Sequence, residues 1–227
     1  MIEIQVLESY DCLSYQKRVF GSRQGLCIFM GTKGTTNRQR IIEAADRLFY
    51  VRGYNQTSFS DISDATGLPR GNFYYYFKTK EDILDAVVES RVDGFDQILS
   101  ACTESIADPR ARLLAFARVP QQHTDQVLQY GCPIGSLSTE LCKSPGQDGS
   151  RLRMTSVFDL LRHWSASQFA ALGIAEQRAD QLALDLLARL QGVVLIANIY
   201  KDAEFLQRAS DDIEGWLVAL ITREVNT

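Results

Sequence analysis

Apolar side chains recur at steps of three and four residues through most of this chain, the spacing that gathers them on one face of an α-helix. The first clear instance is a run of five such positions, Ile41, Ala44, Ala45, Leu48 and Phe49. Thr36 or Asn37 is suited to cap the start of this helix, and Gly53 is suited to end it. The pattern therefore predicts a first amphipathic helix between these caps.

Two shorter helices are predicted next, separated by a glycine turn. Residues 60–66 form the second helix, which ends at Gly67. Pro69 suits the first turn of a third helix that runs to about Phe77, because a proline there gives up a hydrogen bond that the helix would not have made. The apolar contacts between these two helices are expected from Ile62, Ala65, Leu68 and Phe73. Ala65 is expected to be small because the two helices cross closely at this point.

The rest of the chain continues the helical pattern. Thr79 and Asp82 have the spacing of a capping box, which predicts the start of a fourth helix. Further helices are expected at about 109–129, 133–143, 150–171, 175–200 and 202–222. No segment has the sustained alternation of apolar and polar residues that indicates a strand. The predicted fold class is therefore all-α, with a three-helix N-terminal unit and a larger helical unit behind it.

Composition and charge are compatible with this prediction. Hydrophobic residues make up 45% of the chain and charged residues 23%, values typical of a soluble globular protein. The longest apolar stretch, around 192–197, is too short to span a bilayer, so no membrane contact is expected. The net charge of −4 conceals a basic stretch over 33–40, where three basic residues occur without an acid.

Cysteine and histidine usage argues against a disulfide framework and against a structural metal. The chain has five cysteines, an odd number, and no pair with the CxxC spacing. His123 and His163, its two histidines, are far apart in sequence. No metal and no cofactor is therefore expected, and a reducing cytoplasmic compartment fits the free thiols.

The segment from Thr57 to Lys80 carries the functional signal. Its sequence, TSFSDISDATGLPRGNFYYYFKTK, predicts a helix-turn-helix, in which the second helix enters the major groove of DNA. Over about 36–84 the chain resembles the TetR family signature: a Thr-led helix, Ala-x-x-x-Gly, then Gly-x-Phe/Leu-Tyr-x-Tyr/His-Phe-x-x-Lys followed by Glu. The resemblance implies a TetR/AcrR family transcriptional regulator, with a helix-turn-helix DNA-binding domain and a larger helical domain for ligand binding and dimerisation.

Eight residues of this segment are predicted to contact DNA, namely Thr57, Arg70, Gly71, Asn72, Tyr74, Tyr75, Tyr76 and Lys80. Arg70 and Asn72 lead the recognition helix, and their side chains can make bidentate contacts to guanine and to adenine, respectively. Tyr75 is expected to touch a base or a sugar, and Tyr76 a phosphate. The contacts of Arg70 and Asn72 to base edges would read the sequence of an operator in double-stranded DNA.

Other groups are expected to hold phosphates, which fix the register of a protein on DNA without reading its sequence. Thr57, Lys80 and the amides at the start of the second helix are the candidates. Lys33 and Arg38 either reach the minor groove or backbone of DNA, or form only a solvated run of charge.

An aromatic stripe at helical spacing is more often simple packing than a binding surface. In this segment three consecutive tyrosines cannot all face one interior, and their basic neighbours match a phosphate-binding face. Phe73 and Phe77 are the aromatic residues expected in the core. Contact with nucleic acid is therefore the favoured interpretation of the tyrosines.

The family resemblance also implies a homodimer, in which the last two long helices pair with those of a second copy in a four-helix bundle. Two apolar rows are candidates for this role, Leu182, Leu186, Leu190, Val193, Val194 and Ala197 on one helix and Ile213, Trp216, Leu217 and Leu220 on the next. Apolar content this broad exceeds one buried stripe. A dimer also suits a palindromic operator.

The helices between these two regions carry enough aromatic surface to line a pocket for a small apolar or aromatic effector. The broader candidate set is Phe116, Tyr130, Ile134, Met154, Phe158, His163, Trp164 and Phe169. The predicted ligand-binding residues are Phe116, Tyr130, Cys132, Phe158, His163 and Trp164. Any single aromatic member is more often an ordinary core residue, so the pocket is a safer prediction than its membership.

Cys132 has a place in this set for a separate reason. The segment 130–141, YGCPIGSLSTEL, resembles the Gly-Cys-x-x-Gly-x-Leu start of a helix in a TetR subgroup that includes electrophile and quinone sensors. A thiol in the first turn of a helix has its thiolate favoured by the helix dipole, and Cys132 is so placed if Pro133 occupies the first helical position. The alternative is a small buried residue that packs, and Cys142 and Cys102 are weaker candidates.

The sequence is therefore interpreted as a ligand-responsive DNA-binding regulator, a repressor released from a palindromic operator by its effector. A transcriptional activator and a ligand-independent DNA-binding dimer are the alternatives. An enzyme is not expected, because the chain has no phosphate-binding glycine loop, no HExxH and no GxSxG. Three domains are predicted: a flexible extension at 1–30, the DNA-binding domain at 31–78 and the sensing and dimerisation domain at 79–227. For the first segment two alternatives stay open, an upstream start codon that precedes a true start at Met30, and an ordered additional element.

Overall fold

The computed structural model describes residues 36–143 and 148–225, and every element within these ranges is a helix. The helices are α2 (Asn37–Arg52), α3 (Phe59–Thr66), α4 (Arg70–Tyr76), α5 (Lys80–Ser105), α6 (Pro109–Ala117), α7 (Val119–Gln122), α8 (Thr124–Tyr130), α9 (Pro133–Cys142), α10 (Asp148–Ala171), α11 (Glu176–Tyr200) and α12 (Ala203–Val225). The predicted all-α fold class is confirmed. The extension expected at 1–30 lies outside the described residues.

Short-range signals set the helix ends near the N-terminus as predicted. The Thr36 hydroxyl accepts a hydrogen bond from the amide of Gln39 at 3.2 Å, and Gly53 ends α2 with φ at 90°. Thr79 and Asp82 form the predicted reciprocal capping box at the start of α5.

Two boundaries differ from the prediction. Pro69 is the N-cap of α4 and not a residue of its first turn. The single helix expected over 109–129 is divided into α6, α7 and α8, with breaks at Arg118 and His123. Pro120 lies in the first turn of α7, and a proline cannot continue a helix through the preceding turn, because it has no amide hydrogen and its ring clashes with the carbonyl four residues earlier.

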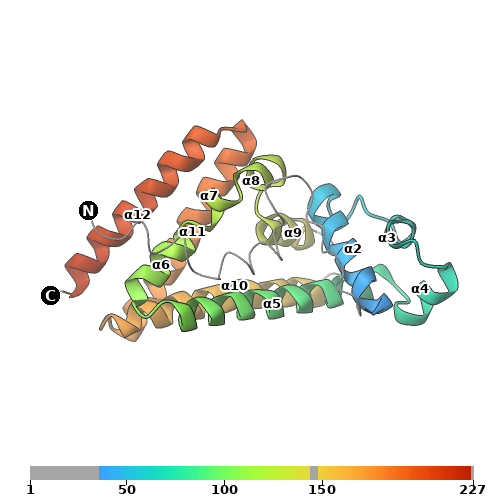
Figure 1. Ribbon diagram of the computed structural model, residues 1–227, viewed down its shortest axis with the longest axis horizontal. Helices are drawn as coiled ribbons and strands as arrows, with labels where there is room; N and C mark the ends of the chain where they lie inside the picture. Colours follow the sequence, from blue (N-terminus) through green and yellow to red (C-terminus); the bar gives the residue numbers. More distant parts are fainter. Residues whose placement is uncertain (1–35, 144–147, 226–227) are drawn as a thin grey trace.

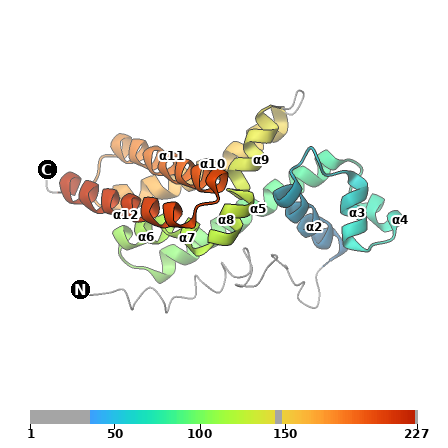
Figure 2. The ribbon, with the colours of Figure 1, turned by 90° about the horizontal axis from the view of Figure 1, so that it is seen from above.

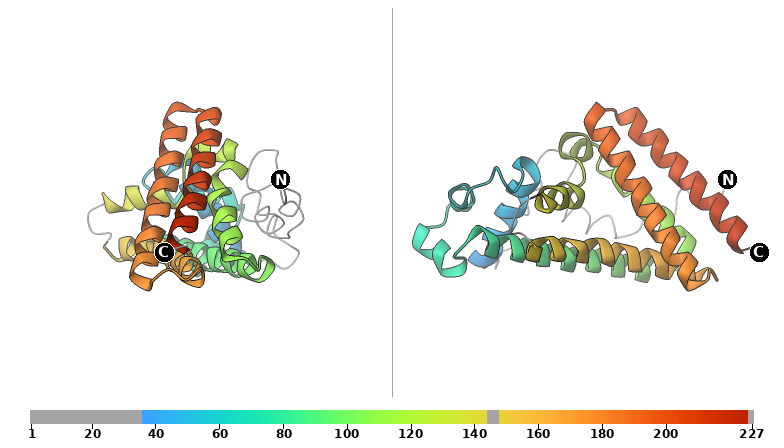
Figure 3. Two further views of the ribbon diagram at one scale, coloured as in Figure 1. Left: turned by 90° about the vertical axis from the view of Figure 1, so that its left-hand side faces the viewer. Right: turned by 180° about the vertical axis from the view of Figure 1, so that it is seen from behind.

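The helices form an elongated molecule with a small group at one end (Figure 1). This group, the head, consists of α2, α3 and α4. From the head α5 and α10 run side by side, and α9 lies between the head and the rest of the chain (Figures 1 and 3). At the far end α11 and α12 form an antiparallel pair, with α6, α7 and α8 against it (Figure 2).

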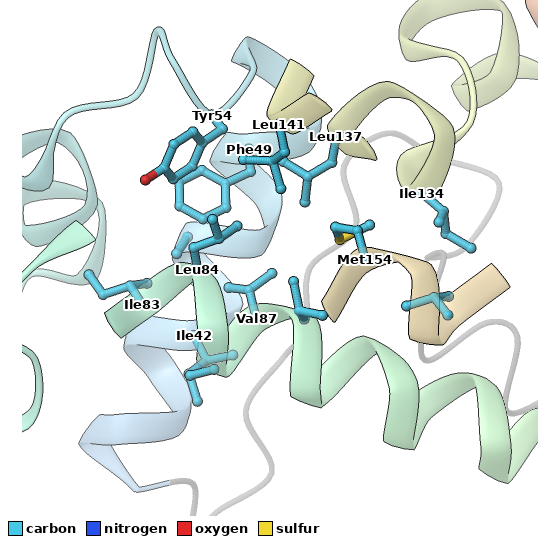
Figure 4. Packing of buried hydrophobic residues seen from close by; sticks show 14 of the residues in the cluster. Ile42, Phe49, Tyr54, Ile83, Leu84, Val87, Ile134, Leu137, Leu141 and Met154 are labelled. Carbon is cyan, nitrogen blue, oxygen red and sulfur yellow. The ribbon is translucent and has the colours of Figure 1, made fainter. Parts of the chain in front are cut away.

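One apolar core joins the head to the long helices (Figure 4). Phe49 of α2 lies in the same buried cluster as Leu84 and Val87 of α5 and Leu137 and Leu141 of α9. Burial of each such side chain contributes about 1.5–3 kcal/mol relative to its exposure. The head is thus packed continuously onto the C-terminal helices.

The contacts predicted between α3 and α4 are correct in part. Ile62 and Phe73 are both fully buried, and Leu68 packs against the same cluster. Ala65, however, is exposed, so the expectation that it separates two closely crossing helices is wrong. The buried face of α3 runs through Ile62, Ser63 and Thr66, and position 65 falls on the other side of the helix.

A second core fills the space between α6, the end of α10, α11 and α12. Its buried members are Leu113, Ala117, Phe169, Ile174, Ala179, Leu182, Leu186, Leu190, Ile213, Leu217, Leu220 and Ile221. The leucine rows that were expected to face a second copy are therefore buried within one chain, and that assignment is corrected. Arg118, between α6 and α7, also links this region, with two 2.6 Å hydrogen bonds to the Glu214 carboxylate of α12.

A different face of α11 is apolar and exposed. Its exposed large residues are Leu184, Leu195, Ile196, Ile199 and Tyr200, between 39% and 74% accessible. The small residues Ala188 and Gly192 lie on the same exposed side. By length and composition α11 could cross a membrane, but it packs against α10 and α12, and a core helix of a helical protein has the same apolar character.

Candidate DNA interface and effector site

Helix α4 divides its aromatic residues between the core and the surface. Phe73 and Phe77 are 0% and 4% exposed, whereas Tyr74, Tyr75 and Tyr76 are 51%, 77% and 36% exposed. The prediction that the phenylalanines are core and that the three tyrosines cannot all be core is confirmed. The short helix is therefore anchored by two rings and presents three others outward.

The candidate base-reading end of α4 is also exposed. Gly71 and Asn72 are both accessible to solvent, and apart from its chain neighbours and the backbone of α4 itself, nothing lies within 4 Å of a Cβ added at Gly71. Tyr74 stacks on Phe59 of α3 at 5.1 Å between ring centroids, and Tyr75 meets Tyr76 edge-on at 5.0 Å. The position of Arg70 opens the helix, while its side chain lies outside the description.

Thr57 does not have the position predicted for it. It is 1% exposed, and its hydroxyl donates a hydrogen bond to the carbonyl of Gly53 at 2.7 Å. A threonine hydroxyl buried in the turn between α2 and α3 cannot reach a phosphate in this conformation. Its role in the structure is to close that turn.

Lys80 is half-buried beneath the same turn. Its ammonium group donates to the carbonyls of Tyr54 and Thr57, both at 3.1 Å, and lies 4.1 Å from the centroid of the Tyr54 ring. Two of the three ammonium N–H groups are thus used within the chain, which leaves one for a phosphate contact. Lys78, which is not among the residues predicted to contact DNA, is exposed just beyond α4 and is a further candidate cation.

The start of α3 offers less to a phosphate than expected. Ser58 and Asp61 form a capping box there, in which the Asp61 carboxylate accepts from the Ser58 amide at 2.7 Å. Hydrogen bonds from Ser58 lower the pKa of Asp61, so this helix end carries a negative charge. Arg38, at the start of α2, is exposed and lies 5.5 Å from the Phe77 ring, close to α4.

Cys132 lies at the start of α9, where the sequence placed it. It is the N-cap residue, and Pro133 follows in the first turn of the helix. Its half-buried Sγ accepts a hydrogen bond from the Gly135 amide at 3.3 Å and one from Nε2 of Gln191 in α11 at 3.4 Å. The sulfur therefore lies between α9 and the long helix α11 and accepts one N–H group from each.

The other predicted effector residues fall into separate places. Phe116 and Trp164 have ring centroids 5.6 Å apart, and both, with Phe158, pack against the core cluster that also includes α5. The Trp164 indole N–H is used within the chain, by the Thr103 hydroxyl at 3.0 Å. Tyr130 instead faces Tyr50 of α2, at 5.3 Å between ring centroids.

His163 is exposed on α10 and does not line the groove described below. It stands two residues from both Leu161 and Ser165, which are buried, and so projects from the opposite side of the helix. The expectation that this histidine binds an effector stays a prediction, and its exposed position lends it no support. The pattern of apolar residues along α10 does not indicate whether position 163 is buried or exposed.

Polar groups that the sequence reasoning missed lie inside the C-terminal helices. Ser165 of α10 and Ser210 of α12 are 0% exposed, and within the described ranges neither hydroxyl has a hydrogen-bond partner. At the start of α8, burial lowers the pKa of His123 to about 4. The two serine hydroxyls, buried and without a partner within the described ranges, are suited to orient a small ligand.

An open groove of about 440 Å³ runs along α5, and none of the predicted effector residues lines it. Its walls come mainly from α5, and Arg38 of α2 and Ser156 of α10 also line it. Four carboxylates line it, from Asp82, Asp85, Glu89 and Asp93. The groove is therefore acidic and unlike the apolar pocket that was expected.

Comparison with known proteins agrees with this arrangement. The family model described as bacterial regulatory proteins, tetR family, matches residues 41–87. A second model, the C-terminal domain of transcriptional regulators similar to LmrA and YxaF, matches residues 110–212. The first covers the head and the start of α5, and the second covers most of the helices behind it.

The curated relatives are regulators of similar length. An uncharacterized HTH-type transcriptional regulator in the lacX 3' region of Lactococcus lactis subsp. lactis is 29% identical over 177 residues, 77% of this chain and 89% of that protein. The HTH-type transcriptional repressor DhaR of Mycobacterium sp. is 29% identical over 185 residues, 77% of this chain and 88% of that protein.

Solved structures share the fold. A TetR transcriptional regulator from Legionella pneumophila superposes with a TM-score of 0.72 at 22% identity, over 81% of this chain and 98% of that one. The reduced form of E. coli NemR gives 0.64 at 21% identity, over 79% and 96%. Members of this family bind DNA and are not enzymes, as the sequence predicted. The chain belongs to the TetR family of helix-turn-helix transcriptional regulators.

Proposed function

We propose that this protein is a cytoplasmic homodimeric repressor, which binds a palindromic operator through α4 and leaves it when a small effector binds behind the head. The observation that carries the proposal is the exposed surface of α4, where Asn72 and three tyrosines face solvent while two phenylalanines anchor the helix. A contiguous exposed aromatic surface of this kind marks an interaction site.

Sequence reading is assigned to the first turn of α4. Asn72 would make a bidentate contact to an adenine edge and Arg70 one to guanine, while Tyr75 meets a base or sugar and Tyr76 a phosphate. The open space around Gly71 supports close approach of DNA, because no packing within the chain requires a glycine there. Lys80 adds a phosphate contact through its remaining N–H group.

The dimer is assigned to the two C-terminal helices, through the exposed face of α11. Leu184, Ala188, Gly192, Leu195 and Ile199 follow one another at helical spacing along that face. A second copy that covers this stripe would remove its apolar surface from water, and the small residues in its middle would let the two helices approach closely. A two-fold symmetric pair of heads matches a palindromic operator.

A repressor is favoured over an activator because the relative DhaR, 29% identical over most of both chains, is named a repressor. A repressor that responds to an effector needs the effector to bind the released form more tightly than the DNA-bound form. Half-buried Cys132 and the aromatic residues Phe116, Phe158 and Trp164 favour an apolar, aromatic or electrophilic molecule.

The test begins with DNA binding. Wild-type protein is incubated with fragments of the DNA that flanks its gene, and a retarded fragment in a mobility-shift assay identifies the operator. Absence of sequence-specific retardation, with every fragment bound alike or none bound, contradicts the proposal.

The effector is then sought with 2-methyl-1,4-benzoquinone and methylglyoxal. Each compound is titrated into the complexes of the wild type, Cys132→Ser and, as a matched control, Cys142→Ser, whose thiol is exposed. If the compound releases DNA from the wild type and Cys142→Ser but not from Cys132→Ser, the protein is a thiol-based electrophile sensor. Equal release from all three proteins assigns the effector to a noncovalent pocket.

A further inference from the structure

Helix α9 is bound to the head at its N-terminal end. Tyr50 of α2 donates a hydrogen bond to the carbonyl of Gly131 at 2.8 Å. Arg91 of α5, only 8% exposed, donates to the carbonyl of Pro133 at 2.7 Å and pairs with Asp46 of α2 at 2.6 Å. The carbonyls on both sides of the candidate effector cysteine are thus held by side chains that belong to α2 or are paired with it.

The other end of α9 also contacts the head, and its polar contact comes from the Glu140 carboxylate. Oε2 of Glu140 accepts the amide of Tyr54 at 2.8 Å, and Oε1 accepts the amide of Asn55 at 2.6 Å. A Cβ at Gly53 would lie 3.2 Å from this carboxylate, and the φ of 90° there already disfavours any other residue. Glu140 therefore fits directly against the turn that joins α2 to α3.

The carbonyls and the amides of this turn have hydrogen-bond partners from two different parts of the molecule. Lys80 and the Thr57 hydroxyl bind its carbonyls from within or just beyond the head. Its two consecutive amides, of Tyr54 and Asn55, both point to Glu140, which comes from the C-terminal helices. Successive amides that converge on one anion form a strong charge-assisted contact. Glu140 thus ties the backbone that leads into α3 to a different part of the molecule.

We propose that Glu140 is a positioning residue for operator binding, whose carboxylate fixes the orientation of α3 and α4 relative to the C-terminal helices. The inference rests on the proposed function, because orientation matters only where two heads must meet two half-sites together. Helix α9 has 10 residues and is about 15 Å long, with Cys132 before its first turn and Glu140 near its end. A shift of α9 at its cysteine end would therefore move the turn and the head with it.

Removal of the Glu140 charge and loss of its positioning role are expected to change operator affinity in opposite directions. Glu140→Gln removes a negative charge, which by electrostatics alone strengthens binding to DNA. It also removes one of the two acceptors for the turn, because an amide has a single oxygen. Loss of positioning therefore weakens operator binding, opposite to the effect of charge. Glu104→Gln, an exposed glutamate on α5, makes the same charge change away from the head and is the matched control.

Operators are first selected from a random DNA library with wild-type protein. Affinity is then measured by fluorescence anisotropy on a panel in which the spacing between half-sites is one base pair shorter, unchanged or one longer. Glu140→Gln should bind the selected spacing about tenfold more weakly and discriminate less among the three. Its nonspecific affinity should not fall, and amide exchange at residues 54 and 55 should be faster. Glu104→Gln should show the wild-type pattern.

A spacing preference in folded Glu140→Gln that equals that of the wild type overturns the inference and leaves the proposed function intact. Failure of the wild type to select any DNA overturns the proposed function, and the inference with it. A purely structural role of Glu140 would lower the melting temperature without a change in spacing preference, which also overturns the inference. If Glu140→Gln does not fold, Glu140→Asp takes its place under the same criteria, because its shorter side chain cannot reach both amides.

Discussion

The head and the C-terminal helices use aromatic residues in opposite ways. In α4 three tyrosines are between 36% and 77% exposed, although two phenylalanines in and beside the same short helix are buried. Behind the head, Phe116, Phe158 and Trp164 all pack partly buried against the core, and Phe169 is fully buried. The exposure of these three aromatic rings supports the binding surface proposed for the head. Aromatic content alone marks no pocket among the helices behind it.

The largest expected effect is on the stability of the head. Phe73→Ala removes a ring that is fully buried and should lower the free energy of unfolding by about 3–5 kcal/mol. Tyr75→Ala, at the 77% exposed neighbour, should change stability by less than about 0.5 kcal/mol and should reduce operator affinity instead. Urea unfolding and anisotropy measure the two quantities. Similar losses of stability in both variants would remove the distinction between anchor and contact surface.

The next effect concerns acid and belongs to the C-terminal helices. Burial lowers the pKa of His123 from 6.5 to about 4, so the unfolded chain takes up a proton at a higher pH than the folded chain. Stability from this group is complete above pH 6.5 and decreases as the pH falls toward 4, by up to about 3 kcal/mol. His123→Gln should flatten this part of the profile in urea unfolding between pH 7 and pH 4.5. A profile as steep as that of the wild type would show that other groups cause the acid sensitivity.

Base reading by the head is expected to have an intermediate effect. Asn72→Ala should cost about 1–3 kcal/mol of discrimination at the position where Asn72 meets adenine, because a bidentate pair is lost. Competition between the operator and single-base variants measures the discrimination, and nonspecific DNA serves as the reference. If the ranking of the variants is unchanged, Asn72 does not read the sequence.

The smallest expected effect is that of a phosphate contact. Lys80→Ala should weaken binding to all sequences alike and reduce the slope of log affinity against log salt by about one unit. The variant should also lose some stability, because the ammonium group bridges the carbonyls of Tyr54 and Thr57. The salt slope and stability of Lys78→Ala are measured for comparison, since this lysine is exposed near the same end of α4. An unchanged salt slope in Lys80→Ala would leave that lysine with its structural role alone.

Signals that act over a few residues could be read from the sequence. The Thr36 cap, the turn at Gly53 and the box of Thr79 with Asp82 each depend on neighbours within four residues. The anchoring role of Phe73 followed from the same local logic, since three tyrosines in a row had to leave the core to other rings.

Other features depend on where distant helices pack. Ala65 and His163 have the residue types expected inside, but the neighbouring helices approach from the other side and both are exposed. Thr57 is buried because the turn itself uses its hydroxyl. Glu140 meets amides 85 and 86 positions away in the chain, and nothing near it in the sequence indicates that contact.

The core that joins the head to α5 and α9 sets a condition for engineering. A chimera that grafts residues 31–78 onto the body of another regulator would keep Ile42 and Phe49 but exchange the surfaces of Leu84, Val87 and Leu137 that enclose them. Interiors are packed too closely to accept such a mismatch without voids or clashes. A working transplant of DNA specificity would therefore have to carry the first turns of α5 and the apolar side of α9, or confine its changes to the exposed residues of α4.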